Sequence, residues 1–211
     1  WIWVGTSIGF VLVGISMCQF VSAAAEGSGI PPVRAILSGL YLKNMLSWWT
    51  YFGKLVGITA MLCSGLSLGK EGPFVHMASI IADNLPWRLV HGNNHTLRHQ
   101  LLTAAIAVGV TATFGAPIGG ALFSIELTTH IYNIYNLWKA FFASFVAVIL
   151  FKGLQFYNKV KLFDADGEHF YRSHSTIGLN AEAISYLVLS IILGLFGCLF
   201  IWLMKNFLTF K

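Results

Sequence analysis

The chain has 211 residues, of which 56% are hydrophobic and 10% are charged, and its mean hydropathy is +0.72. A soluble domain carries about a quarter charged residues, so this composition excludes an ordinary soluble globular protein and favours an integral membrane protein. The net charge of +5 comes from basic residues spread among the ends of apolar segments. This distribution is typical of charges at membrane surfaces and lacks the basic cluster that nucleic-acid binding needs.

Apolar runs separated by glycine and proline predict a series of helices. We expect helices at residues 1–21, 31–42, 46–66, 73–84, 101–113, 117–131, 137–156 and from 181 onward. Polar stretches are expected at 86–99, with a candidate helix start near Thr96, and at 158–180. The uncharged runs 1–25 and 183–204 each exceed the roughly 20 residues that cross a bilayer. No alternation of polar and apolar residues is long enough for a sheet. The predicted fold class is therefore all-α integral membrane.

Residues 69–73, with the sequence GKEGP, place an ionisable pair between two apolar segments. Charged groups at membrane depth are costly and usually mark an ion or proton pathway. Pro73 is expected at the first position of a new helix, whose unpaired N–H groups and positive dipole end suit an anion. Glu71 would lie where such an anion binds.

A second break, GSGIP at residues 27–31, has glycines that turn tightly and expose N–H groups, and Pro31 can open the next helix. Ser28 adds a hydroxyl donor. Neutral donors can replace an anion's hydration without trapping it, which conduction requires. Taken alone, this break also fits a helix–turn–helix corner capped by serine. Together with a less regular break at 115–120, however, the pair predicts the interior of a transporter or channel.

These motifs resemble those of the CLC family of chloride channels and chloride/proton antiporters. The resemblance rests on residues 27–31, on GKEGPFVH at 69–76, and on GAPIGG at 115–120 leading into LFSIE at 122–126. It implies a multi-helix CLC-type fold with broken, re-entrant helices and an inverted-repeat architecture. Residues 1–211 would be a partial transmembrane domain that contains mainly the first repeat, within a larger protein.

The resemblance also assigns roles to individual residues. Glu71 would be the gating glutamate, whose carboxylate competes with chloride for one helix N-terminus, and Ser28 would supply the hydroxyl of the central chloride site. The implied chloride-binding residues are Gly27, Ser28, Gly29, Ile30, Lys70, Gly72 and Phe74. No catalytic residue, metal or cofactor is expected, since chloride itself is the transported ligand.

One position departs from the antiporters of the family. They carry a proton-transferring glutamate directly after the residue that matches Glu126, and here that position is Leu127. Leucine cannot carry a proton, so passive conduction is favoured and the chain resembles the plasma-membrane channel branch. We expect a voltage- or pH-gated chloride channel that forms a homodimer in the bilayer and passes chloride and other small anions.

Two other functions are kept as alternatives. The first is a chloride/proton antiporter of the same family, in which protons would use another route and the location could be an endomembrane. The second is a non-conducting membrane scaffold subunit, against which the intact Ser28 and Glu71 argue. An intramembrane enzyme is disfavoured because no paired nucleophile and base is found in the sequence.

Overall fold

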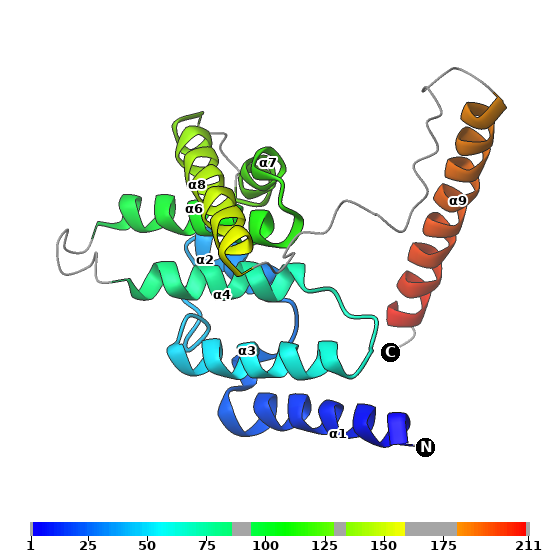
Figure 1. Cartoon of the computed structure of the whole chain (residues 1–211), viewed down its shortest axis with the longest axis horizontal. Coiled ribbons are helices and arrows are strands. Elements are labelled where there is room, and N and C mark those ends of the chain that lie inside the picture. Colours follow the sequence, from blue (N-terminus) through cyan, green and yellow to red (C-terminus); the bar gives the residue numbers. More distant parts are fainter. Residues whose placement is uncertain (1, 86–93, 129–133, 159–180, 210–211) are drawn as a thin grey trace. The chain divides into compact units, whose positions relative to one another are not determined.

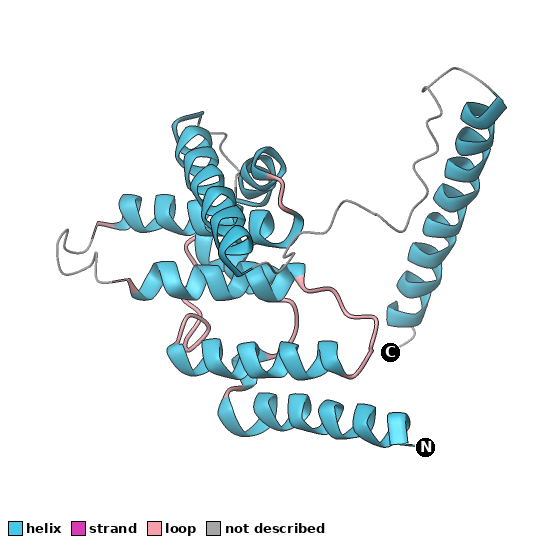
Figure 2. Ribbon diagram, in the orientation of Figure 1, coloured by secondary structure: helices cyan, strands magenta, loops and turns pink. Residues whose placement is uncertain are grey.

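The computed structural model describes residues 2–85, 94–128, 134–158 and 181–209 of the chain. It divides into two compact units, Trp1–Asp164 and Ala165–Lys211, which are described separately below. Every regular element among the described residues is a helix (Figures 1 and 2). The predicted all-α class is confirmed.

Each predicted helix is present, and residues 95–99 of the predicted polar stretch are also helical. In chain order the helices are α1 (Ile2–Ser16), the π-helical turn η1 (Met17–Val21), the 3-10 turn η2 (Ala23–Ala25), α2 (Ile30–Leu37), α3 (Trp48–Cys63), α4 (Glu71–Asn84), α6 (His95–Phe114), α7 (Pro117–Thr128), α8 (Ile134–Asn158) and α9 (Ala181–Thr209). Helix α2 ends at Leu37 rather than at residue 42, because Gly39 adopts a left-handed φ of +94° and closes the helix. The polar stretch predicted at 158–180 lies almost entirely outside the described residues.

The start of α4 corrects one prediction. The helix begins at Glu71, so Pro73 is its third residue and not its first. Proline is tolerated anywhere in the first turn, because those N–H groups have no intrahelical acceptor in any case. The earlier start makes Glu71 and Gly72 the first two helical residues.

In the first unit, α6 packs against α4, α7 and α8, while α1 packs against α3 (Figure 1). The core joins α2, α4 and α6 through the buried side chains of Val33, Leu37, Val75, Leu102, Ile106 and Val110. Gly109 permits close approach of α6 to the first turns of α4, because a Cβ there would lie 2.8 Å from the Cα of Val75. The core therefore fixes the position of α4 relative to α2 and α6.

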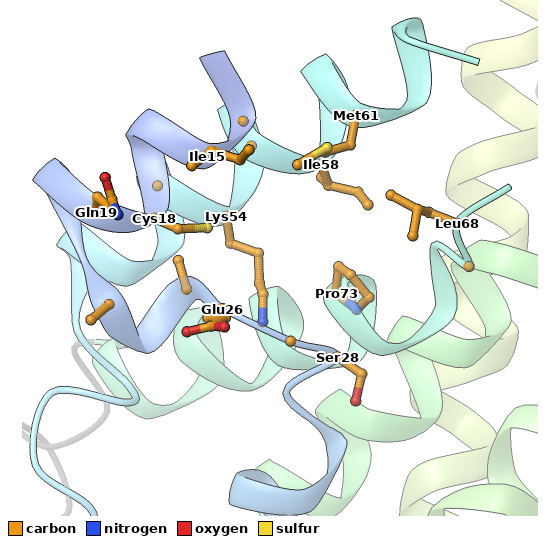
Figure 3. Close-up of a pocket in the computed structure, with 17 residues that line it drawn as sticks. Ile15, Cys18, Gln19, Glu26, Ser28, Lys54, Ile58, Met61, Leu68 and Pro73 are labelled. Carbon is orange, nitrogen blue, oxygen red and sulfur yellow. The ribbon is translucent and has the colours of Figure 1, made fainter. Parts of the chain in front are cut away.

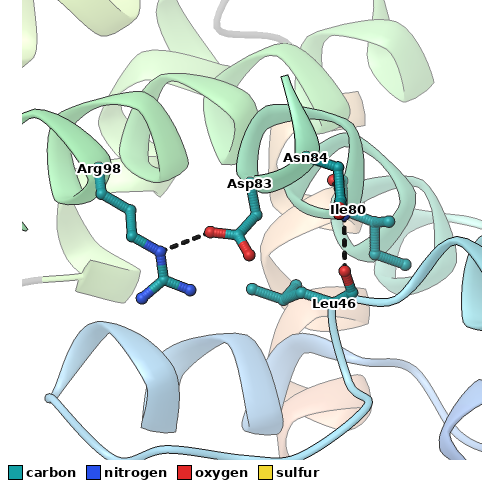
Figure 4. A network of polar contacts seen from close by, with 5 residues as sticks. All are labelled: Leu46, Ile80, Asp83, Asn84 and Arg98. Atoms are coloured by element: carbon teal, nitrogen blue, oxygen red, sulfur yellow. Dashed lines mark hydrogen bonds and ion pairs between the residues drawn. The ribbon is translucent and has the colours of Figure 1, made fainter. Parts of the chain in front are cut away.

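The far end of α4 is anchored by polar contacts (Figure 4). Arg98 Nε of α6 donates to the Asp83 carboxylate, and Asn84 Nδ2 donates to the carbonyl oxygens of Leu46 (2.6 Å) and Ile80 (2.8 Å). These contacts tie the C-terminal end of α4 to α6 and to the segment before α3. A rigid helix held at this end also holds its opposite end, where Glu71 lies.

Among the described residues, three helices are long and apolar enough to cross a membrane, as judged by length and composition. They are Ile2–Val21, Tyr135–Tyr157 and Ile184–Thr209, with mean hydropathies of 1.8, 1.7 and 2.7. Helix α9 belongs to the second unit, and its described side chains are exposed and mostly apolar all round. Such a helix is typical of a segment surrounded by lipid or by other membrane helices.

Candidate anion site

Two of the predicted breaks meet in space. Ser28 lies between Gly27 and Gly29, whose left-handed φ values of +73° and +84° turn the chain into α2. Gly72, the second residue of α4, lies directly against this turn. A Cβ at Gly72 would be 2.5 Å from Ser28 Cβ and 2.8 Å from the Ser28 carbonyl oxygen. Only glycine fits at this contact, so the sequence allows the starts of α2 and α4 to touch.

A cavity of about 770 Å³ lies beside this contact (Figure 3). The first break contributes Gly27 and Ser28 to its lining, and the second break contributes Gly69 and Pro73. The remaining predicted anion-binding residues lie next to these in the chain without lining the cavity: Gly29, Ile30, Lys70, Gly72 and Phe74. The cavity walls thus come from the two helix starts together with α1 and α3.

The backbone N–H groups at the helix starts are partly used. The N–H of Ile30 donates to Ser28 Oγ at 3.3 Å, and that of Phe74 donates to the Lys70 carbonyl oxygen at 3.1 Å. Pro73 has no N–H, so Glu71 and Gly72 are the residues of the first turn of α4 whose N–H groups lack an intrahelical acceptor. Such N–H groups, aligned with the positive end of the helix dipole, form a favourable environment for an anion.

The Glu71 carboxylate turns back toward the chain that precedes it. A Cβ at Gly69 would lie 2.6 Å from Glu71 Oε2, so the missing side chain of Gly69 makes room for the carboxylate close to the cavity wall. Among the described residues, the half-buried Glu71 side chain makes no hydrogen bond or ion pair. It can therefore move without breaking a polar contact, as a tethered anion that competes with a diffusible one would need to do.

This region also contains a cation that was not predicted from the sequence. Lys54 lines the cavity, is only 3% exposed and is the single charged residue of α3. Its Nζ lies 2.8 Å from His76 Nδ1 on α4. A lone lysine within an apolar helix was the available signal, because buried ionisable groups in membrane segments usually serve function. Glu26, directly before the first break, also lines the cavity (Figure 3).

The third break has a different environment. Gly115 caps α6 with a φ of +68°, and α7 begins at Pro117. A Cβ at Gly120 would lie 2.6 Å from the Ala107 carbonyl oxygen and would also overlap the Thr111 hydroxyl, so this glycine allows α7 to pack closely on α6. On the same helix, the half-buried Leu127 packs against the core shared by α2, α4 and α6.

Apolar helices with a cavity beside two helix starts are typical of integral membrane proteins that handle small ions. Residues 9–211 match the family described as voltage gated chloride channel, and the chain belongs to this family. The resemblance noted in the sequence is thus confirmed.

Relatives of both functional kinds are similar to the chain. It is 37% identical, over 99% of its length, to chloride channel protein clh-3 of Caenorhabditis elegans, of which it covers 22%. It is 36% identical, over 91% of its length, to H(+)/Cl(-) exchange transporter 5 of Oryctolagus cuniculus, of which it covers 23%. The chain therefore spans less than a quarter of the length of these relatives.

A solved structure supports the fold. The crystal structure of a eukaryotic CLC transporter superposes with a TM-score of 0.66 at 36% sequence identity, covering 71% of this chain and 29% of that one. The prediction of a CLC-type fold is thereby confirmed.

Proposed function

We propose that the full-length protein is a chloride channel whose anion pathway passes the starts of α2 and α4. The observation that carries this proposal is the contact between Gly72 and Ser28 beside the cavity. It brings the Ser28 hydroxyl next to the first turn of α4, and Glu71, which does not itself line the cavity, directly precedes Gly72 in that turn. Neutral donors of this kind stabilise an anion that has lost water and still let it leave.

In this proposal Glu71 is the gate. When ionised, its carboxylate occupies the region that a chloride ion would occupy at the start of α4. When protonated or displaced, it leaves that region to the diffusible anion. The unpaired state of the side chain among the described residues supports this role, since both positions are then accessible.

Leu127 supports passive conduction over proton-coupled exchange. It packs into an apolar core, so neither its chemistry nor its surroundings provide for proton transfer at this position. Channel-named and exchanger-named relatives are similarly close, and the exchanger is therefore the second candidate. The proposal includes a homodimer in the plasma membrane, which is supported by the resemblance to the channel branch.

Reversal potentials of the full-length protein test this proposal. A passive chloride channel reverses at the chloride equilibrium potential whatever the pH gradient, whereas an exchanger shifts its reversal potential when the pH gradient changes. A shift with pH would select the exchanger. A protein that reaches the membrane and carries no anion flux would select the scaffold.

The Glu71→Gln variant tests the gate. Glutamine keeps the shape of the side chain and removes its charge, so we expect a constitutively open pathway with most voltage or proton dependence lost. Normal gating in this variant would refute the role of Glu71 without bearing on chloride selectivity.

A further inference from the structure

Lys54 and His76 form a buried pair between α3 and α4. Lys54 is 3% exposed, His76 is fully buried, and Lys54 Nζ lies 2.8 Å from His76 Nδ1. The other ring nitrogen, Nε2, lies 2.9 Å from the carbonyl oxygen of Met45. Both nitrogens of the imidazole are therefore engaged.

These partners fix the direction of the hydrogen bonds. A carbonyl oxygen can only accept, so His76 Nε2 must donate to Met45. Nδ1 then carries the lone pair of a neutral imidazole and accepts from the Lys54 ammonium. The lysine gains a hydrogen-bond partner without gaining a counter-charge.

Among the described residues, no acidic side chain forms an ion pair with Lys54, and Glu26 lines the same cavity without making one. Buried charges are normally paired with an opposite charge. Within the described part of the chain, the ion pair found is Arg98–Asp83, far along α4 from Lys54. Lys54 instead lines the cavity that Ser28 and Pro73 also line, and Figure 3 shows its side chain reaching from α3 toward the turn that carries Glu26 and Ser28.

His76 also contacts the Ser28 turn. A Cβ at Gly29 would lie 2.5 Å from both Cβ and Cγ of His76, so the backbone of this turn packs directly on the histidine. A single side chain therefore touches the turn, the ammonium and the segment before α3. Few side chains could do all three, because the contact with Lys54 needs an acceptor and the contact with Met45 needs a donor.

We propose that His76 is a positioning residue that holds the Lys54 ammonium at the wall of the anion cavity without neutralising it. An anion in the cavity then supplies the counter-charge, so chloride affinity depends on Lys54 as His76 holds it. The inference rests on the proposed anion site, and it adds a fixed cation to the neutral donors at the two helix starts. Coulombic attraction to a buried ammonium is stronger than to one in bulk water.

A double-mutant cycle on the purified full-length protein tests this role, with chloride binding measured by calorimetry. We expect Lys54→Met to weaken chloride binding about tenfold, because a nearby unit charge is removed. His76→Leu should weaken it several-fold, and the double variant should bind no more weakly than Lys54→Met alone. The amide of His76→Gln can accept from Lys54 and donate to Met45, so this variant should bind chloride like the wild type. A difference of up to about twofold in affinity lies within the usual error of such comparisons.

A merely structural role for His76 predicts a different pattern. The loss caused by His76→Leu would then persist in the Lys54→Met background, and the two effects on chloride affinity would add. That result, or equal losses in His76→Gln and His76→Leu, would overturn the inference. If leucine prevents folding, His76→Asn takes its place, because its shorter amide cannot bridge both partners.

Flux measurements on the same proteins separate this inference from the proposed function. Chloride conduction by the wild type together with an additive cycle overturns the positioning role alone. A non-additive cycle in a protein that binds chloride and conducts none overturns the channel proposal and supports the positioning role.

Discussion

The glycines of the breaks at residues 27–31 and 69–73 differ from those at 115–120 in what they touch. Gly72 lies against Ser28, and Gly29 lies against His76, so the first two breaks contact each other and the residues around a cavity. Gly120 lies against Ala107 and the Thr111 hydroxyl, within the packed interface of α6 and α7.

This difference shows that one sequence signature serves two physical purposes. In the first pair, close approach of backbones brings unpaired N–H groups to the edge of a cavity. In the third break, close approach only allows two helices to pack, and the nearby hydroxyl of Thr113 is satisfied by the Gly109 carbonyl oxygen. Substitutions at matched glycines separate the two purposes.

The largest effect is expected from Gly72→Ala. Its Cβ would lie 2.5 Å from Ser28 Cβ and 2.8 Å from the Ser28 carbonyl oxygen, so the starts of α2 and α4 must separate. We expect a loss of stability of about 3 kcal/mol, at the upper end for overpacking, together with loss of chloride binding. Thermal unfolding and chloride calorimetry of the full-length protein measure the two effects.

Gly119→Ala is the matched control, because its Cβ would lie 3.6 Å from Ala116 Cβ, an ordinary contact distance. It should unfold and bind chloride like the wild type. A Gly72→Ala protein that behaved like this control would show that the two helix starts do not depend on their contact.

Gly120→Ala should destabilise the protein and leave the anion site intact. Its Cβ would lie 2.6 Å from the Ala107 carbonyl oxygen, which belongs to a helix backbone that cannot easily move. We expect a loss of about 2 kcal/mol, as is usual for one excess methyl group in a packed interface. Chloride affinity per folded molecule should remain unchanged, and a large change in it would remove the distinction between the breaks.

A smaller effect is expected from alanine at Gly27 and Gly115, which have similar left-handed φ values of +73° and +68°. Each substitution should cost about 1–2 kcal/mol, the strain of an L-residue in this region. At Gly27 nothing lies within 4 Å of the new Cβ, so strain is the whole cost there. We expect similar losses of thermal stability, with weaker chloride binding only for Gly27→Ala, because that change rotates the peptide next to Ser28. Equal chloride affinities would contradict this expectation.

Much of the fold could be predicted from the sequence because the helices are long, apolar and separated by clear breaks. The start of α6 was expected near Thr96, and Asn94 caps it there by accepting from the N–H groups of Thr96 and Leu97. The start of α4 was misplaced because the rule for proline at helix starts does not distinguish positions within the first turn. Packing of Gly72 on Ser28 is a tertiary contact between residues 44 apart in the chain, and no local pattern encodes it.

The candidate site could be predicted only in part. The two motifs identified Ser28 and Glu71, and the roles of both remain predictions to be tested. Lys54 was missed because it stands within a predicted helix, whereas the anion-binding residues were sought at the breaks between helices. The contacts of His76 could not be predicted, because its two polar partners come from α3 and from the segment before it and cannot be found by spacing along α4.

The smallest effect is expected from Ser28→Ala, which changes the first pair of breaks by one hydroxyl and leaves the backbone contacts in place. Ser28 Oγ accepts from the Ile30 N–H, so its own O–H is oriented away from that bond and can donate to an anion. Loss of one such hydrogen bond is worth about 1 kcal/mol, which corresponds to roughly fivefold weaker chloride binding. The order of permeability among chloride, bromide, nitrate and iodide should also change, since these anions differ in their need for a strong donor.

Ser38→Ala, at the other end of α2, is the control. It removes a hydroxyl that donates to the Arg34 carbonyl oxygen at 3.0 Å, and it should change neither chloride affinity nor the order of permeability. An unchanged selectivity order in Ser28→Ala would reduce Ser28 to a helix cap and leave the first break no more functional than the third.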